Sequence, residues 1–280
     1  MPNSIEYFKQ YVPILDEIYK LNSLSSVLDG NPDLVEAGRN ANELVIPKLS
    51  MSGLAHYSRS LGYTQGDIDL TYETVKCNYD RGRMFTIDAV DDMEVAGLLY
   101  AKTADTFIKE KVVPELDAFR FSQYAQAEGI GTEEEELLTG EAVVEALRMA
   151  QNAMDEEEVP TEGRILFITP TLHGKVQDLD TTKSKLVFEN LNVVKVPQSR
   201  LNSNVVLGED GFTLEGTPLN FLLIHPTATI QFQKHTAPKV IAPGVNQDAD
   251  AWKFGYRTVG ICDTYENKVK GIFAHKTATV

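Results

Sequence analysis

Cysteine is nearly absent from this 280-residue sequence, which contains only Cys77 and Cys262. Two cysteines are too few for a disulfide scaffold, and they lack the paired spacing of a structural zinc site. Histidine is scarce as well, and no two of the five histidines lie three or four positions apart, the spacing of a helical metal pair. The sequence therefore offers no disulfide framework and no metal site, and its cysteine usage is typical of a reduced, intracellular protein.

Long apolar runs and catalytic motifs are missing too. No stretch approaches the roughly 20 apolar residues that cross a bilayer, and the N-terminus has no basic region followed by an apolar segment. The sequence has no P-loop, no dinucleotide-binding glycine pattern after a strand, and no Gly-x-Ser-x-Gly elbow. We therefore expect neither a membrane span nor a secretion signal. The sequence also shows no recognisable catalytic or cofactor-binding motif.

Positive charge is in short supply. The chain has 26 Lys and Arg against 41 Asp and Glu, a net charge of −15, which argues against a protein that grips nucleic acid by counterion release. The acidity is largely local, because residues 128–162 contain twelve acidic residues and one basic residue, Arg148. Such a run is usually a solvated face, and its spacing does not fit an EF-hand. Because paired carboxylates can act as catalytic acid and base, a hydrolase remains an alternative function.

What the sequence does contain is the composition of a globular protein, with 42% hydrophobic and 24% charged residues. At its N-terminus, apolar residues recur at helical spacing, although Pro13 must kink or restart a helix there. These apolar residues are Phe8, Val12, Leu15 and Tyr19. Such an amphipathic arm needs a surface to lie on.

Residues 44–87 show strand-like patterns instead. Alternation over 68–74 follows an apolar strand at 44–46, and the Gly-rich stretch 61–66 predicts the tip of a long hairpin between them. An isolated two-stranded ribbon is marginal in water. The hairpin is therefore expected to pack on another part of the chain or on another subunit.

A long helix is predicted over residues 91–127. Its apolar positions Ile108, Val112, Leu116 and Phe119 are spaced four, four and three residues apart. At 1.5 Å per residue it would be roughly 55 Å long. Pro114 should kink this helix or begin a second one at its first turn.

Residues 138–245 are predicted to form a compact α+β unit. Thr139 can cap a helix, and an apolar strand at 164–168 runs into Thr169-Pro170, a natural start for a following helix. Further strands are expected at 193–196, 219–225 and 239–242. We expect this unit to be an insertion, because the aromatic-rich residues 254–273, interpreted as a hairpin turning near 266–268, should return to the long helix.

Basic and acidic residues alternate where the strand pattern ends. Arg81 and Arg83 lie in the sequence Asp80-Arg81-Gly82-Arg83, and several acidic residues, including Asp88 and Glu94, follow closely. Such neighbours can form charge-assisted pairs within one subunit or across an interface. The alternatives are exposed local pairs that contribute little to stability, and a phosphate site.

The order of these parts resembles the major capsid proteins of tailed bacteriophages, which have the Hong Kong ninety-seven type of capsid fold. The resemblance covers nearly the whole chain. It rests on six segments in order: 41–49 (ANELVIPKL), 52–59 (SGLAHYSR), 80–88 (DRGRMFTID), 112–120 (VVPELDAFR), 254–257 (FGYR) and 265–275 (YENKVKGIFAH).

The resemblance implies an α+β fold with an N-terminal arm, an extended hairpin loop, a peripheral domain that holds a long spine helix, and an inserted axial domain. Mapped onto this sequence, the arm is 1–40 and the extended loop with its base is 41–88. The peripheral domain is 89–137 with 246–280, and the axial domain is 138–245. In such proteins the arm and the loop reach over neighbouring copies of the same chain.

The implied function is that of a structural protein, not an enzyme, that self-assembles through pentamers and hexamers into an icosahedral virion shell around double-stranded DNA. A separate scaffolding protein, a portal and a decoration protein are the implied partners, and assembly is expected in the host bacterial cytoplasm. No membrane is involved. We assign assembly contacts, as a hypothesis, to Arg81, Arg83, Asp88, Arg59, Tyr63 and Glu94, with Arg81 and Arg83 as the expected subunit-crossing ion pairs.

One family feature is not expected here. Some relatives weld their shells by an isopeptide bond from a lysine at the loop tip, but no lysine lies between Lys48 and Lys76 in this chain. We therefore predict no such crosslink. The alternative within the same fold is an encapsulin, a bacterial compartment that holds a cargo enzyme, and the remote alternative is the carboxylate-based hydrolase.

Overall fold

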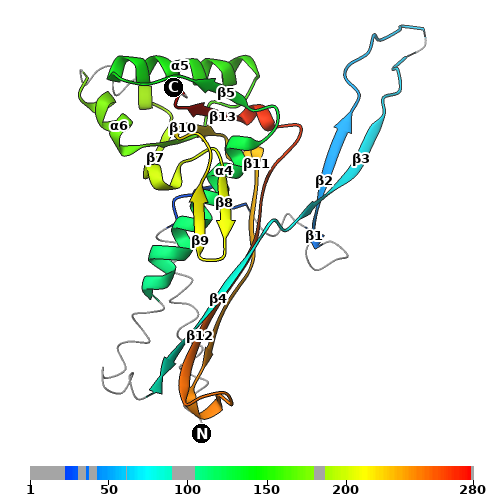
Figure 1. The fold of residues 1–280 in the computed structure, drawn as a ribbon. Helices are drawn as coiled ribbons and strands as arrows, with labels where there is room; N and C mark the ends of the chain where they lie inside the picture. The colour runs from blue at the N-terminus through cyan, green and yellow to red at the C-terminus, as the bar shows by residue number, and fades with distance from the viewer. Residues whose placement is uncertain are drawn as a thin grey trace.

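The computed structural model describes residues 23–30, 36–37, 43–60, 62–89, 105–179 and 187–278. Three parts stand out in Figure 1. A mixed sheet covered by helices forms the upper body, a long three-stranded sheet runs down from it, and a two-stranded ribbon projects to one side. The predicted α+β class is confirmed.

The upper body is built on a five-stranded sheet with the order β5-β13-β10-β6-β7. Every residue of β6 and β10 is buried, as is typical of strands that are covered on both faces. The strands predicted at 164–168, 193–196 and 219–225 are thereby confirmed. Their bounds are β5 (Gly131–Glu134), β6 (Ile165–Ile168), β7 (Asn192–Lys195), β10 (Leu219–Ile224) and β13 (Ile272–Lys276).

Two helices cover one face of this sheet. Helix α5 (Gly140–Glu156) begins as predicted, because the Thr139 hydroxyl accepts a hydrogen bond from the Ala142 amide at 3.2 Å. Its predicted apolar face, Val143, Leu147, Ala150 and Met154, packs against the sheet. Helix α6 (Pro170–Gln177) follows β6 directly, so the predicted strand, turn and helix are also confirmed.

The second sheet contains three long strands in the order β11-β12-β4. All are antiparallel, with bounds β4 (Tyr79–Asp88), β11 (Thr229–Ile241) and β12 (Ala251–Thr264). The strand expected at 239–242 is therefore only the end of a much longer one.

The predicted hairpin in 254–273 is wrong. Strand β12 pairs with β11 and β4, whereas β13 pairs with β10 and β5. Residues 265–271, which include the short helix η7 (Val269–Gly271), carry the chain from one sheet to the other. Two strand patterns with a turn between them fit a chain that changes sheets as well as they fit a hairpin, so the pattern alone cannot distinguish the two.

Helix α4 (Val113–Gln126) lies between the two sheets and contacts β12 and β13. It is the C-terminal part of the predicted long helix, whose residues 91–104 lie outside the described chain. Pro114 lies in the first turn of α4, as the second of the two predicted alternatives has it. The preceding turn, Ile108–Val112, is π-helical and the Val113 amide bonds to the Ile108 carbonyl. A wider turn relieves the clash between a proline ring and the carbonyl four residues earlier.

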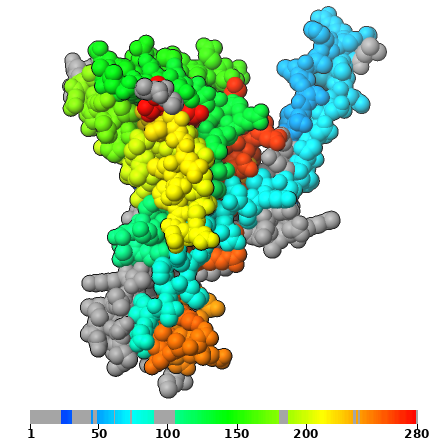
Figure 2. Space-filling model, in the orientation of Figure 1, coloured from blue at the N-terminus to red at the C-terminus, as the bar shows by residue number. Residues whose placement is uncertain are grey.

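The projecting ribbon consists of β2 (Glu43–Met51) and β3 (Ile68–Lys76), with the short β1 (Glu36–Ala37) beside β2. The predicted hairpin is confirmed. Its loop is longer than the predicted tip, since residues 52–67 connect the strands and Ser58 pairs with Gly62 inside that loop. In Figures 1 and 2 the ribbon stands clear of the body.

Sheet pairing crosses two of the expected domain boundaries. Strand β5, in the expected peripheral segment 89–137, and β13, in 246–280, both join the five-stranded sheet. Strand β11, in the expected insertion 138–245, pairs along its length with β12. The pairings of β13 with β5 and β10 join strands far apart in the chain, so sequence order could not indicate them. Strands β11 and β12 are consecutive, and their pairing crosses the boundary expected at 245. None of the helices in the described ranges is long and apolar enough to span a bilayer.

Candidate assembly surfaces

The ribbon has one apolar face and one polar face. Because side chains alternate along a strand and opposed residues share a face, Leu49 and Leu70 lie together, followed by Met51 and Ile68. These four side chains are between 53% and 73% exposed, as is Tyr72 at 59%. A bare apolar surface of this kind is typical of an interaction site.

The loop at the ribbon's end continues this surface. Leu54 is fully exposed, and the ring of Tyr63, 90% exposed, meets the ring of Tyr57 edge-on at 5.0 Å between centroids. Arg59 is exposed on the same loop. Tyr63 and Arg59, two of the residues assigned to assembly, are thus exposed on the loop of a ribbon that projects from the body in Figure 1, where a neighbouring molecule could reach them.

Arg81 is the third residue of β4, the strand that follows β3 of the ribbon. Its Nε donates to Glu115 Oε1 on α4 at 2.8 Å, and its guanidinium also donates to the Gly211 carbonyl at 3.2 Å. The hydrogen bond to Glu115 raises the pKa of Arg81. The Tyr79 hydroxyl donates to the same carboxylate oxygen at 3.0 Å, so Glu115 fixes β4 against the helix.

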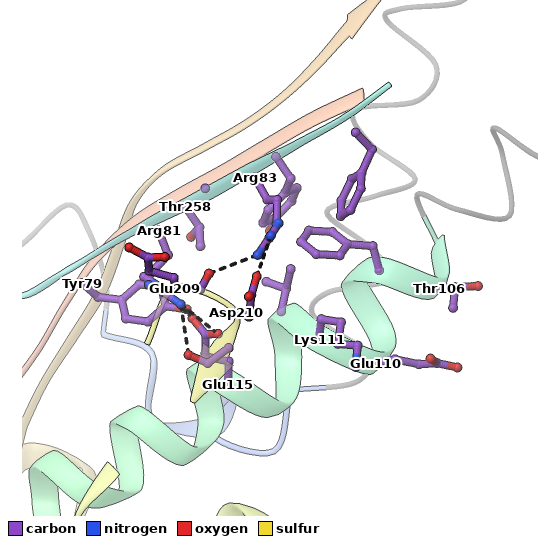
Figure 3. Close-up of a pocket in the computed structure, with 16 residues that line it drawn as sticks. Tyr79, Arg81, Arg83, Thr106, Glu110, Lys111, Glu115, Glu209, Asp210 and Thr258 are labelled. Atoms are coloured by element: carbon purple, nitrogen blue, oxygen red, sulfur yellow. Dashed lines mark hydrogen bonds and ion pairs between the residues drawn. The ribbon is translucent and has the colours of Figure 1, made fainter. Parts of the chain in front are cut away.

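Arg83, two residues further along the same face of β4, holds the turn between β8 (Val205–Gly208) and β9 (Gly211–Leu214). It donates to the Glu209 carbonyl at 3.1 Å and pairs with Asp210 at 2.7 Å. Figure 3 shows both arginines gathered around this turn. Beside them lies a cavity of about 550 Å³, walled by Phe85, Phe107 and Tyr256.

The structure thus gives Arg81 and Arg83 partners within their own chain, where the sequence suggested pairs between subunits. The sequence could not indicate these partners, because Glu115, Glu209 and Asp210 are distant from the two arginines along the chain and other acidic residues are nearer. Asp88 is exposed at the end of β4, opposite Ala251 on β12. Glu94 lies outside the described residues.

The described residues also show what chemistry is available. They contain no group of three His, Cys, Asp or Glu side chains that could hold a metal ion. Burial raises the pKa of the Cys262 thiol to about 12, so this cysteine is not a nucleophile near neutral pH. Burial, with a smaller contribution from Glu135, raises the pKa of Glu133 within the acidic run. The exposed acidic residues Glu141 and Glu145 lie on the outer side of α5.

Comparisons with known proteins give a clear result for the fold. No family model and no curated protein sequence matches the chain. Among solved structures, one from Gordonia phage Cozz matches with a TM-score of 0.64 at 12% identity, covering 92% of this chain and 86% of that one. The capsid of the cyanophage P-SCSP1u matches with a TM-score of 0.61 at 13% identity, covering 86% of this chain and 85% of that one.

A third similar structure is the virus-like particle from Pyrococcus furiosus. Its TM-score is 0.55 at 11% identity, and the match covers 97% of this chain and 100% of that one. Similarity at this level of identity establishes architecture. The chain therefore has the fold of phage capsid subunits, the Hong Kong ninety-seven type of capsid fold.

Proposed function

We propose that this chain is the major capsid protein of a tailed bacteriophage, which assembles through pentamers and hexamers into an icosahedral head around double-stranded DNA. The observation that carries the proposal is the ribbon. Its apolar face is exposed in the part of the chain that the structure describes, and the fold it belongs to is that of shell subunits. A second copy of the chain supplies the surface that the ribbon lacks.

Each part of the molecule has a role in this proposal. The arm and the ribbon β2–β3 tie neighbouring subunits together, and the long sheet with α4 forms the peripheral domain. The axial domain is the five-stranded sheet with its helices, so we propose that it includes β5 and β13 as well as most of the insertion. Heterologous contacts around the axial domain close into rings of five and six.

The net charge of −15 suits this role. A head must contain DNA without resisting its packing or release, so the lining should not bind phosphate tightly. Scaffolding, portal and decoration proteins are the partners we propose, with assembly in the host cytoplasm and the virion as the final location.

A precise deletion tests the proposal. Residues Ser52 and Asp67 face each other across the ribbon, with the Ser52 amide bonded to the Asp67 carbonyl at 3.0 Å. Deleting residues 54–65 joins Gly53 to Gly66, which leaves a two-residue Gly-Gly turn of the kind that closes hairpins. We expect folded, soluble subunits that form no shells in electron micrographs, while the unmodified chain, with scaffold where needed, forms them.

The control replaces Tyr57 and Tyr63 by phenylalanine, which keeps the ring contact and should keep shell formation. Normal shells from the deleted chain would contradict the assigned role of the loop. A small, monodisperse oligomer of the unmodified chain under all salt and crowding conditions would contradict shell formation and favour the hydrolase.

The second candidate is an encapsulin-type compartment, favoured by the end-to-end match to the Pyrococcus furiosus particle. Neighbouring genes distinguish the two. Portal, terminase and scaffold genes indicate a phage, whereas a peroxidase or ferritin-like gene indicates a compartment. The contents of native particles give the same distinction, as DNA or as a protein cargo.

A further inference from the structure

The most heavily hydrogen-bonded carboxylate of the described chain belongs to Asp117, which is fully buried on α4. It accepts hydrogen bonds from the Ser23 hydroxyl at 2.8 Å, the Leu24 amide at 3.0 Å, and both the amide and the hydroxyl of Ser25 at 3.2 and 2.6 Å. The guanidinium of Arg200 donates a fifth bond at 3.2 Å. Four of the five donors therefore come from three consecutive residues that lie more than ninety positions away in sequence.

A second buried charge on the same helix holds the same segment. Arg120, 2% exposed, donates to the Ser25 hydroxyl at 2.9 Å and pairs with Asp29 at 3.5 Å. From β11, the Gln231 side chain donates to the Ser25 carbonyl and to Asp29, both at 2.7 Å. The Ser25 hydroxyl thus donates to Asp117 and accepts from Arg120, which carry opposite charges on α4. Leu28, at the end of the same segment, packs into the main core.

These contacts make residues 23–29 part of the interior. If the segment left α4, Asp117 would lose four of its five hydrogen bonds and Arg120 would lose its contacts with Ser25 and Asp29. Breaking a buried, hydrogen-bonded network of charges is strongly destabilising. Undocking is therefore disfavoured as long as α4 stays folded.

We propose that residues 23–29 form a permanently docked latch, which fixes Ser23, the first residue that the structure describes, on α4. Arg200 gives the latch a second function. It lies in η4 (Gln198–Arg200), which follows β7 of the five-stranded sheet. The Asp117 carboxylate therefore accepts hydrogen bonds both from residues 23–25 and from a residue that follows a strand of that sheet. The latch thereby couples the position of Ser23 on α4 to the position of the five-stranded sheet against the same helix.

Hydrogen exchange of the full chain tests the latch. In Asp117→Asn, the amide group cannot accept from all five donors, so we expect the Leu24 and Ser25 amides to exchange about ten- to hundredfold faster. Amides of β6 and β10 should keep their protection. The matched control is Asp155→Asn, which removes a carboxylate that pairs with Arg164 at 2.6 Å on the half-exposed side of α5 and should leave the latch unchanged.

A milder variant keeps the test open if Asp117→Asn does not fold. Ser25→Ala removes only the bridging hydroxyl and should speed exchange of the Leu24 amide by severalfold. Unchanged exchange at Leu24 in a folded Asp117→Asn or Ser25→Ala variant would overturn the latch.

The coupling needs its own readout. Arg200→Met keeps an unbranched apolar stem but removes the donor, which holds Asp117 less firmly. We therefore expect faster exchange of the Leu24 and Ser25 amides, which donate to the same carboxylate. In Asp117→Asn, adding Arg200→Met should change this exchange little further, because the shared acceptor is already impaired. Equal effects of Arg200→Met in both backgrounds, or no effect in either, would overturn the coupling.

Discussion

The ribbon and the five-stranded sheet both contain large apolar residues, but the sheet buries them and the ribbon exposes them. In β10 all six residues are buried, and in β6 all four are. In the ribbon, Leu49, Met51, Ile68 and Leu70 are each more than half exposed. Apolar content alone therefore does not say whether a strand stabilises its own chain or joins another. The presence of helices over the sheet makes the difference, because none of the helices that the structure describes lies over the ribbon.

Removing a ring from the sheet should produce the largest loss of stability. Phe167 in β6 is fully buried and its ring lies 4.9 Å from that of Phe121 on α4. We expect Phe167→Ala to lower the free energy of unfolding by about 3–5 kcal/mol, since it leaves a cavity between sheet and helix. Urea denaturation of the unassembled chain measures this, and a loss below about 1 kcal/mol would contradict the difference drawn between sheet and ribbon.

Acid should weaken the same sheet. Burial lowers the pKa of His275 in β13 to about 4, so the folded state keeps it neutral while the unfolded chain, with a pKa near 6.5, binds a proton. Stability contributed by neutral His275 is therefore lost as the pH falls from about 6.5 towards 4, by up to about 3 kcal/mol. Unfolding free energies at pH 7 and pH 4 measure the loss.

The control for this prediction is His275→Gln, which cannot titrate and should show a smaller loss over the same pH range. The difference between the two proteins isolates the histidine from Glu133, whose raised pKa acts in the opposite direction. Identical pH profiles would show that His275 does not contribute.

The cap of α5 gives a smaller effect on the body. Thr139→Ala removes the acceptor for the Ala142 amide, and we expect a loss of about 1 kcal/mol in unfolding free energy. Thr139→Ser keeps the hydroxyl and should cost only a few tenths of that amount. Thermal unfolding of both variants checks the prediction, which fails if they are equally stable.

The smallest effect on stability should come from the ribbon. Leu70→Ser replaces a side chain that is 53% exposed, and we expect a change in unfolding free energy within about 0.5 kcal/mol. Under the proposed function, the same change should reduce the yield of shells measured by sedimentation. Thr71→Ser, on the polar face, is the control. A stability loss comparable to that of Phe167→Ala would mean that the ribbon packs within its own chain.

Local patterns predicted the elements of this fold well and their partners poorly. The cap at Thr139, the strand before Pro170 and the hairpin 44–74 depend on neighbouring residues, and the structure confirms them. The pairing of β12 with β4 instead of β13 depends on residues more than 160 positions apart, from Ala251 opposite Asp88 to Gly260 opposite Tyr79. No local rule contains that information.

The site residues show the same limit. The sequence identified Arg81 and Arg83 as charged groups in need of partners, yet the partners lie on α4 and on the β8–β9 turn. Asp117 gave no signal at all, because an aspartate on a helix usually lies at the surface. Ser23, Ser25 and Ser26 form a polar stretch that by itself indicates only a turn-rich connection. Their role becomes clear once the fold brings them onto α4.

The position of β13 has a consequence for how the molecule is made. It is an inner strand of the five-stranded sheet, between β5 and β10, although it is the last strand in the chain. During synthesis, β5 has no neighbour and β10 has one open edge until residues 272–276 have been made. The upper body is therefore completed late. Under the proposed function, an unfinished chain would lack the final shape that a growing shell needs.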